Sequence, residues 1–341
     1  MSKFIIRNKI NSLLKSNAKA PIVELEFLGT GGAFDVEEKN SSMLLKMGAG
    51  NVLIDCGSTV YAELRQKNLI EDIKYIFITH CHEDHIGSLS TLIYHKFFVL
   101  KEQVLIECEP ALEEKLTAYL IDICGHSEES FKINSNNGDV YQDLNMRIFK
   151  IDTTNHHYKD YATAGFVFSF RKSGEDVYII YSGDINTPIT EVIEGKMPVL
   201  YEKLLNEPEN VFILHEATAR EYPPHYPHCD FLKLIKTAEV FPNIYTYHHN
   251  KEETKTIIAQ YQDNKRKLEY AVAKIENELE EKLARIQDVE AHEKLRIEAR
   301  NVKEMFKEEF GNIESSAVVY DVNQTGSILV IQEKLGIGNI K

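Results

Sequence analysis

The sequence predicts an α/β protein in which a sheet-rich domain is followed by a long helical arm and a C-terminal β-hairpin. Short apolar runs alternate with turn residues from Ile22 to about Tyr247, a pattern typical of a sheet-rich domain. Residues 243–310 contain no Gly or Pro and are rich in Glu, Lys, Ala and Leu, which predicts a long helix. Two further apolar runs flank Asn-Gln-Thr-Gly near the end of the chain, as in a hairpin.

The strands of the first domain can be read from their β-branched and aromatic runs. In chain order the clearest runs are VELEFLG, NVLIDCG, YIFIT, QVLIE, GFVFSF, VYIIYSG, NVFILHE and NIYTYH. We expect four parts: a basic amphipathic segment at 1–20, the sheet-rich domain at 21–250, the helical arm at 251–311 and the hairpin tail at 312–341.

The arm contains an apolar seam of the coiled-coil type. Its members recur three or four residues apart and are Leu268, Val272, Ile275, Leu279, Leu283 and Ile286. A homodimer formed through the helix at 251–310 is the expected use of this seam. An antiparallel helical hairpin and a recognition surface for a macromolecular partner remain as alternatives.

Composition limits the classes of function. The chain has 341 residues and a formal charge of −14, which argues against a general electrostatic grip on long nucleic acid. Small anionic substrates stay possible, because bound metal ions can invert the local field. Five scattered cysteines without a Cys-x-x-Cys pair predict a reducing, cytoplasmic location. Arg7, Lys9 and Lys15 interrupt the apolar residues of the N-terminal segment, so we expect neither a signal peptide nor a membrane span.

A metal-ligand motif follows one of the predicted strands. The stretch YIFITHCHEDHIGSL places His80, His82, Asp84 and His85 within six consecutive residues. In an extended loop, residues two apart point to the same side, so His80 and His82 can bind one ion while Asp84 and His85 turn toward a second. Imidazole and carboxylate ligands suit zinc first, with manganese or iron as alternatives.

Further ligand candidates stand where other strands end. They are His156 and His157 after one strand, Asp184 after the run VYIIYSG, and His248 and His249 after NIYTYH. Two ions need more ligands than one loop supplies, so these residues complete the predicted site. For Asp184, a turn aspartate that caps the following segment is the alternative.

This set of motifs resembles the metallo-β-lactamase fold superfamily over roughly Ile22 to Asn250. The run FLGTGGAF, with its Gly-rich turn, and Asp55 in VLIDCG match two further features of that family. The resemblance implies that residues 21–250 form a four-layer αββα sandwich that carries a dinuclear, catalytic metal site.

The resemblance also implies a ligand set, with two Zn²⁺ ions as the expected cofactor. One ion would take His80, His82 and one of His156 and His157, and the other would take Asp84, His85 and one of His248 and His249, with Asp184 as the bridge. Family members place a glycine eight residues after the third ligand, which from Gly165 selects His157. The last ligand usually follows its strand directly, which selects His248.

Within the superfamily, the run ILHEAT is similar to the phosphodiesterase branch, which includes ribonuclease Z and cyclic-nucleotide enzymes. In that branch the glutamate of His-Glu-Ala-Thr pairs with a histidine about twenty residues before the last ligand, here Glu216 and His228. The residues expected in catalysis are Asp84, Glu216 and His228. The ordinary alternative is that Glu216 caps a helix and that His228 lies in a Pro-rich surface loop.

The resemblance implies a phosphodiesterase in which a hydroxide between the two ions attacks phosphorus in line. A small substrate such as a cyclic nucleotide is favoured, because the acidic chain lacks the Gly/Pro-rich arm and the Pro-x-Lys-x-Arg-Asn motif of ribonuclease Z. An RNA-processing endonuclease of ribonuclease Z type, and hydrolysis of a lactone, thioester or β-lactam on the same metals, are the alternatives. A non-enzymatic scaffold for the arm fits less well, since a scaffold needs no bridging carboxylate.

Overall fold

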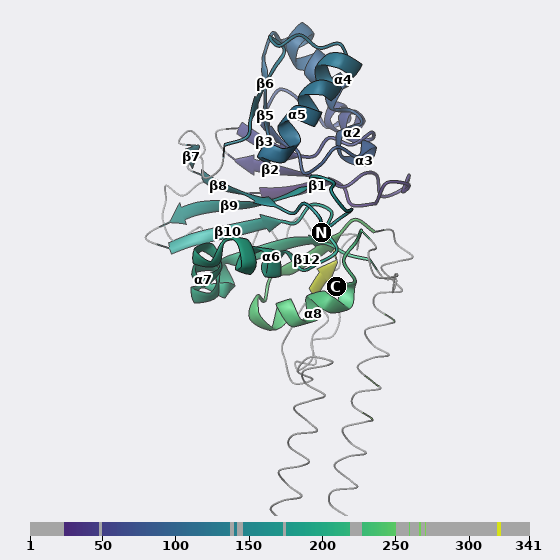
Figure 1. Cartoon of the computed structure of the whole chain (residues 1–341). Helices are drawn as coiled ribbons and strands as arrows, with labels where there is room; N and C mark the ends of the chain where they lie inside the picture. Colours follow the sequence, from purple (N-terminus) through teal and green to yellow (C-terminus); the bar gives the residue numbers. More distant parts are fainter. Residues whose placement is uncertain are drawn as a thin grey trace, which may run out of the picture.

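The computed structural model describes two facing β-sheets between two layers of helices (Figure 1). It describes residues 24–47, 50–136, 140–141, 146–172, 175–218, 227–249, 259, 266, 270 and 319–321. Most of the predicted arm, the N-terminal segment 1–20 and most of the hairpin tail lie outside these residues.

The first sheet is built by the N-terminal half of the described chain. Its strands, in both chain and spatial order, are β1 (Glu24–Gly29), β2 (Ser42–Met47), β3 (Gly50–Ile54), β4 (Ile73–Phe77), β5 (Val104–Glu107) and β6 (Phe131–Asn134). β1 to β3 pair antiparallel, and β3 to β6 pair parallel. The carboxyl ends of the parallel strands therefore meet at one edge of this sheet.

The second sheet has an antiparallel and a parallel part as well. Its strands are β7 (Val140–Tyr141), β8 (Met146–Asp152), β9 (Ala164–Lys172), β10 (Glu175–Tyr181), β11 (Val211–Glu216), β12 (Ile244–Tyr247) and β13 (Val319–Asp321), in the spatial order β13-β12-β11-β10-β9-β8-β7. β7 to β10 pair antiparallel and β10 to β13 parallel. The described strand of the tail, β13, thus extends this sheet.

Helices cover the outer face of each sheet. On the first sheet these are α2 (Val60–Gln66), α3 (Glu83–Ile86), α4 (Leu89–Tyr94) and α5 (Pro110–Ala118), with π-helical turns η1 (His95–Leu100) and η2 (Tyr119–Ile123). On the second sheet they are α6 (Ile189–Lys196), α7 (Pro198–Asn206), the 3₁₀ turn η3 (Pro208–Asn210) and α8 (Phe231–Val240). The order helices, sheet, sheet, helices is the predicted four-layer sandwich (Figure 1).

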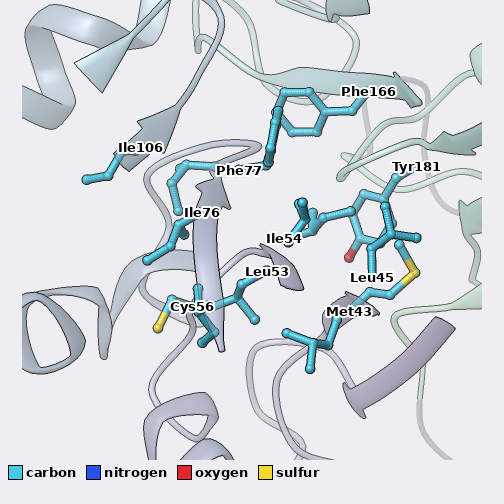
Figure 2. Packing of buried hydrophobic residues seen from close by; sticks show 14 of the residues in the cluster. Met43, Leu45, Leu53, Ile54, Cys56, Ile76, Phe77, Ile106, Phe166 and Tyr181 are labelled. Carbon is cyan, nitrogen blue, oxygen red and sulfur yellow. The ribbon is translucent and has the colours of Figure 1, made fainter. Parts of the chain in front are cut away.

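Aromatic side chains fill the space between the two sheets. Phe77 at the end of β4 packs edge-on against Phe166 of β9, with ring centroids 5.2 Å apart (Figure 2). It packs in the same way against Phe168 of β9, with centroids 5.3 Å apart. Burial of each such ring contributes roughly 1.5–3 kcal/mol.

Alternate residues of β11 point to opposite sides, since Phe212 lies in this inter-sheet core and Ile213 packs in the core under α6 to α8.

No helix among the described residues has the length and apolar character needed to cross a membrane.

Candidate metal centre

The predicted ligands meet where parallel strands of both sheets end. His80, His82, Asp84 and His85 follow β4 of the first sheet, with the last two on the short helix α3. From the second sheet come His157 after β8, Asp184 after β10 and His248 directly after β12, and the predicted catalytic residue Glu216 is the last residue of β11. Open α/β sheets commonly place their sites at such strand ends.

The first group of ligands consists of three histidines. His80 Nε2 and His82 Nδ1 lie 2.9 Å apart, and His157 Nε2 lies 3.4 Å from His82 Nδ1. Their nitrogens are all within 4.8 Å of one another, so a single ion could contact the three.

The second group combines two carboxylates and two histidines. His85 Nε2 lies 3.3 Å from Asp84 Oδ2 and 3.4 Å from Asp184 Oδ1. His248 Nε2 lies 3.4 Å from Asp84 Oδ2 and also 3.4 Å from Asp184 Oδ2. Nitrogen and oxygen ligands in this arrangement suit a divalent transition-metal ion.

Asp184 links the two groups. Its Oδ2 lies 3.9 Å from His80 Nε2 of the first group, while its two oxygens contact His85 and His248 of the second. Among the described residues, His85 Nε2 and Asp184 Oδ1 are buried atoms without a hydrogen-bond partner, and they face each other across 3.4 Å. Buried polar atoms are almost always satisfied, so this pair fits a site that takes a cation.

Hydrogen bonds behind the ligands fix their orientation. Asp55 accepts from His85 Nδ1 at 2.8 Å, and it also accepts from the backbone amide and hydroxyl of Thr79. The Thr79 hydroxyl lies 3.0 Å from His80 Nδ1, and His157 Nδ1 donates to the carbonyl of Pro227 at 2.8 Å. These contacts leave Nε2 of His80, His85 and His157 as the atoms that could bind a metal ion.

Glu216 and His228 form a carboxylate–imidazole pair beside the cluster. Glu216 is fully buried, and its Oε1 accepts from the backbone amides of Ile185 and Cys229, each at 2.9 Å. Its Oε2 lies 3.0 Å from His228 Nδ1, which is itself 3.9 Å from Asp184 Oδ2. The pair is therefore held rigidly against the residue that links the two ligand groups.

The charges of this cluster are strongly coupled. Burial opposes a charge on His85, but the carboxylates of Asp184 and Asp55 outweigh it and hold the His85 pKa well above its usual range. Burial alone would raise the pKa of Asp184, yet His248 and His85 keep that pKa well below its ordinary value. Burial also opposes a charge on His228, but Glu216 raises the His228 pKa to about 9.

In each histidine doublet one member joins the cluster and the other lies apart. His157 is in the first ligand group, whereas His156 has Lys196 and Asp152 as charged neighbours. His248 is in the second group, whereas His249 Nε2 lies 3.4 Å from the hydroxyl of Thr246. The geometry thus favours His157 and His248 of the alternatives that the sequence leaves open.

Positive φ angles set the direction of two candidate ligands, His248 and Asp184. His248 has φ 69°, in the left-handed region, and its amide donates to the carbonyl of Thr30 in the Gly-rich turn at 2.8 Å. Gly183, directly before Asp184, has φ 63°, and a Cβ there would lie 2.5 Å from the Ala164 carbonyl oxygen. Only glycine fits that position without strain.

Sequence reasoning missed three side chains around the site. Thr79 is one of them, and its place directly before His80 was a usable signal. The others are Tyr161, whose ring stacks on His82 with centroids 4.6 Å apart, and Tyr158, whose ring lies 4.8 Å from that of His157. The tyrosines gave no sequence signal, because nothing in their spacing distinguishes them from core aromatics.

Comparison with known proteins identifies the family. A model of the family described as Anti-Pycsar protein Apyc1 matches residues 23–271. The chain belongs to this family. Its match to the Anti-Pycsar protein Apyc1 of Paenibacillus sp. (strain J14) is 40% identical over 77 residues, 22% of this chain and 31% of that protein.

Two further relatives support the fold and the branch. Ribonuclease Z of Clostridium novyi (strain NT) is 39% identical over 77 residues, 21% of this chain and 25% of that protein, so both curated matches span a third or less of their relatives. The metallo-β-lactamase fold protein YhfI of Bacillus subtilis superposes with a TM-score of 0.52 at 18% identity, over 68% of this chain and 87% of YhfI. The metallo-β-lactamase fold predicted from the motifs is therefore confirmed.

Proposed function

We propose that this protein is a two-metal hydrolase of small phosphodiesters, with cyclic nucleotides as the substrate class. The observation that carries the proposal is the Glu216–His228 pair, which lies against Asp184 at the centre of the ligand cluster. A pair of this kind suits protonation of an alkoxide leaving group, which phosphodiester cleavage requires. Membership of the Apyc1 family and the similarity to ribonuclease Z support the same class.

Two divalent ions, most simply Zn²⁺, would occupy the two ligand groups. His80, His82 and His157 would hold one, Asp84, His85 and His248 would hold the other, and Asp184 would contact both. When bound, such ions supply a nucleophile from water at neutral pH and neutralise charge on the phosphoryl oxygens. Elemental analysis of the purified protein should find about two transition-metal ions per chain, and none after reconstitution would contradict the assignment.

Side chains of the protein would supply the proton that the leaving oxygen needs. Glu216 holds the Nδ1 proton of His228, so His228 Nε2 is the atom that would donate to the leaving oxygen. Asp84 acts in catalysis as a ligand that fixes the geometry of the second group, since it contacts both His85 and His248. The carboxylate of Asp55 keeps His85 in place.

A leaving-group comparison tests this function. His228→Ala should lower hydrolysis of a cyclic nucleotide by roughly 10²–10⁴-fold, because the ribose oxygen must leave with a proton. Hydrolysis of bis(p-nitrophenyl) phosphate should fall far less, since p-nitrophenolate needs none. His249→Ala is the matched control, as His249 is buried outside the cluster. Equal losses on both substrates would remove the acid role from His228.

A substrate panel separates the alternatives. Parent protein loaded with zinc should hydrolyse cyclic nucleotides faster than a transfer-RNA precursor or a lactone. The formal charge of −14 supports this order, because it disfavours binding of long RNA. A faster reaction with the precursor would support the ribonuclease Z alternative, and one with the lactone would place the enzyme in the carbonyl-hydrolase class.

The arm at 251–311 is proposed to join two copies of the chain. The support is its apolar seam, in which each buried large side chain would contribute roughly 1.5–3 kcal/mol. Replacing Ile275, Leu279 and Leu283 with polar residues should shift the protein to monomer in light scattering with its metal content unchanged. Loss of metal at constant mass would instead place the arm against its own catalytic domain.

The five cysteines, none of them in a disulfide, support a cytoplasmic location.

A further inference from the structure

One aromatic side chain beside the cluster, that of Tyr158, is about half exposed. Tyr158 lies in the loop after β8, and its ring makes edge-on contacts with His157 at 4.8 Å and with His82 at 6.0 Å between centroids. The side chain is nevertheless 49% exposed. A large ring that touches two ligand histidines and still faces solvent is available to a molecule that enters the site.

The neighbouring Tyr161 shows the contrast. Its ring stacks on His82 with an interplanar angle of 23°, and the Lys115 ammonium lies over the same ring at 5.2 Å. Both contacts tie Tyr161 to the protein, so it supports the ligand His82. The ring contacts of Tyr158 are edge-on, with interplanar angles of 69° and 74°, and no cation of the described residues lies over its ring.

Tyr158 also lies on the open side of the cluster. His80, His85, His157 and His248 are buried, whereas His82 is half-buried and the His228 side chain is 21% exposed. The ring of His157 is near both, 5.1 Å from that of His82 and 5.5 Å from that of His228. A phosphodiester that approaches over His82 and His157 would come close to Tyr158, whose ring contacts both.

We propose that Tyr158 is the stacking platform for the nucleobase of the substrate, an inference that rests on the proposed function. In a mononucleotide only the ribose separates the base from the phosphorus. When the phosphate is at the ligand cluster, the base therefore lies one ribose away, beside the exposed ring of Tyr158. Stacking on a ring face suits every base, because each has a π-face. The sequence offers no evident set of base-reading side chains, and a stacking platform needs none.

Kinetics on two substrates test the role. Adenosine 3′,5′-cyclic phosphate and a base-free ribose 3′,5′-cyclic phosphate contain the same diester. Tyr158→Ala should lower kcat/KM for the nucleotide by roughly ten- to a hundredfold, mainly through KM, and that for the base-free diester by much less. Tyr158→Phe should restore the nucleotide rate, because the ring and not the hydroxyl stacks.

Phe98→Ala is the matched control for removal of an exposed ring. Phe98 is 58% exposed, and its described ring contacts are Tyr94 and Phe97, outside the cluster. This variant should keep both rates. Equal losses of Tyr158→Ala on the two substrates, or no loss on either, would overturn the stacking role while leaving the proposed function intact. A parent protein that hydrolyses neither diester would remove the proposed function, and the stacking role with it.

Nucleotide binding can be measured without turnover by the fluorescence of an introduced tryptophan, because the chain contains none of its own. Tyr158→Trp therefore creates the one tryptophan of the chain beside the cluster, and it can be excited at wavelengths that the tyrosines do not absorb. In metal-loaded protein, adenosine 5′-monophosphate should quench it and ribose 5-phosphate should not, whereas Phe98→Trp should respond to neither. Unchanged Tyr158→Trp fluorescence at nucleotide concentrations that inhibit hydrolysis would overturn the proposal.

Discussion

The two halves of the ligand cluster are built in different ways. The half from the first sheet is one short stretch, His80 to His85, which runs from the end of β4 into α3. The half from the second sheet comes from residues far apart in the chain, His157, Asp184, His228 and His248, which follow different strands or lie in the segment after β11. A local stretch places its ligands wherever its strand ends, but the scattered half needs the correct register of β8 to β12.

The difference implies unequal responses to mutation. The local half is backed by Asp55 and Thr79, which lie next to it in the first sheet. The scattered half meets the local half at three residues: Asp184 approaches His80 and His85, His157 lies 3.4 Å from His82, and His248 lies 3.4 Å from Asp84. Asp184 approaches residues of both ligand groups, so its removal should disturb both, whereas loss of a supporting residue should weaken one of them.

The largest effect is expected for Asp184→Ala. The variant loses the carboxylate that both ligand groups share, so hydrolysis of the best substrate should fall by at least about 100-fold and metal content should drop below that of the parent. The circular dichroism spectrum should persist, since the strands on either side are held by their own ladders.

Asp72→Ala is the control for this comparison, because Asp72 is an exposed acid directly before β4. Its activity and metal content should match the parent. Activity of Asp184→Ala within a few fold of the parent would show that the two ligand groups work without a shared carboxylate.

An intermediate effect is expected for Asp55→Asn. The amide of the variant can still accept a hydrogen bond from Thr79. It lacks the negative charge that the Asp55 carboxylate places beside His85, whose Nδ1 lies 2.8 Å from Asp55 Oδ2. Metal affinity should fall by roughly 10- to 100-fold, as measured by competition with a chromogenic chelator. The loss should concern one of the two ions first, because Asp55 contacts a ligand of the second group. Simultaneous and equal loss of both ions would mean that the two ligand groups cannot load separately.

The smallest effect concerns a buried histidine outside the cluster. His126 bonds the hydroxyl of Ser90 through Nε2 at 2.9 Å, and burial lowers its pKa below the ordinary value. A depressed folded-state pKa means that the unfolded chain binds a proton first, so the stabilisation is present at neutral pH and is lost as pH falls below about 6.5. The slope for one proton is at most about 1.4 kcal/mol per pH unit.

Thermal unfolding of the parent and of His126→Gln at pH 8 and pH 5 measures this contribution. The stability advantage of the parent should shrink at the lower pH. A constant difference between the two proteins would show that His126 acts through packing against Tyr94 alone, whose ring lies 3.9 Å away.

Much of the fold could be predicted from residue patterns. The eight apolar runs named above all lie on strands of the two sheets, because β-branched and aromatic residues favour a half-buried pleated surface. The strands β2, β6, β7 and β8 were not singled out, since β2, β6 and β8 mix Lys, Asn or Arg with the apolar residues and β7 has only two residues. The place of β13 beside β12 was not predicted either, because strand pairing between distant segments leaves no local pattern.

The sequence by itself determined which ligands this protein offers and which of them are neighbours. His80, His82, Asp84 and His85 must lie together because they follow one strand within a few residues, and Asp184 and the doublets must lie at strand ends. The resemblance to the family, and not the local pattern, favoured His157 and His248 and indicated the Glu216–His228 pair, because spacing alone does not say which of two adjacent histidines faces a site. Only the tertiary structure brings these residues together: His157 and His248 lie in the two ligand groups, and Glu216 Oε2 lies 3.0 Å from His228 Nδ1, since the sheets place segments that are far apart in the chain side by side.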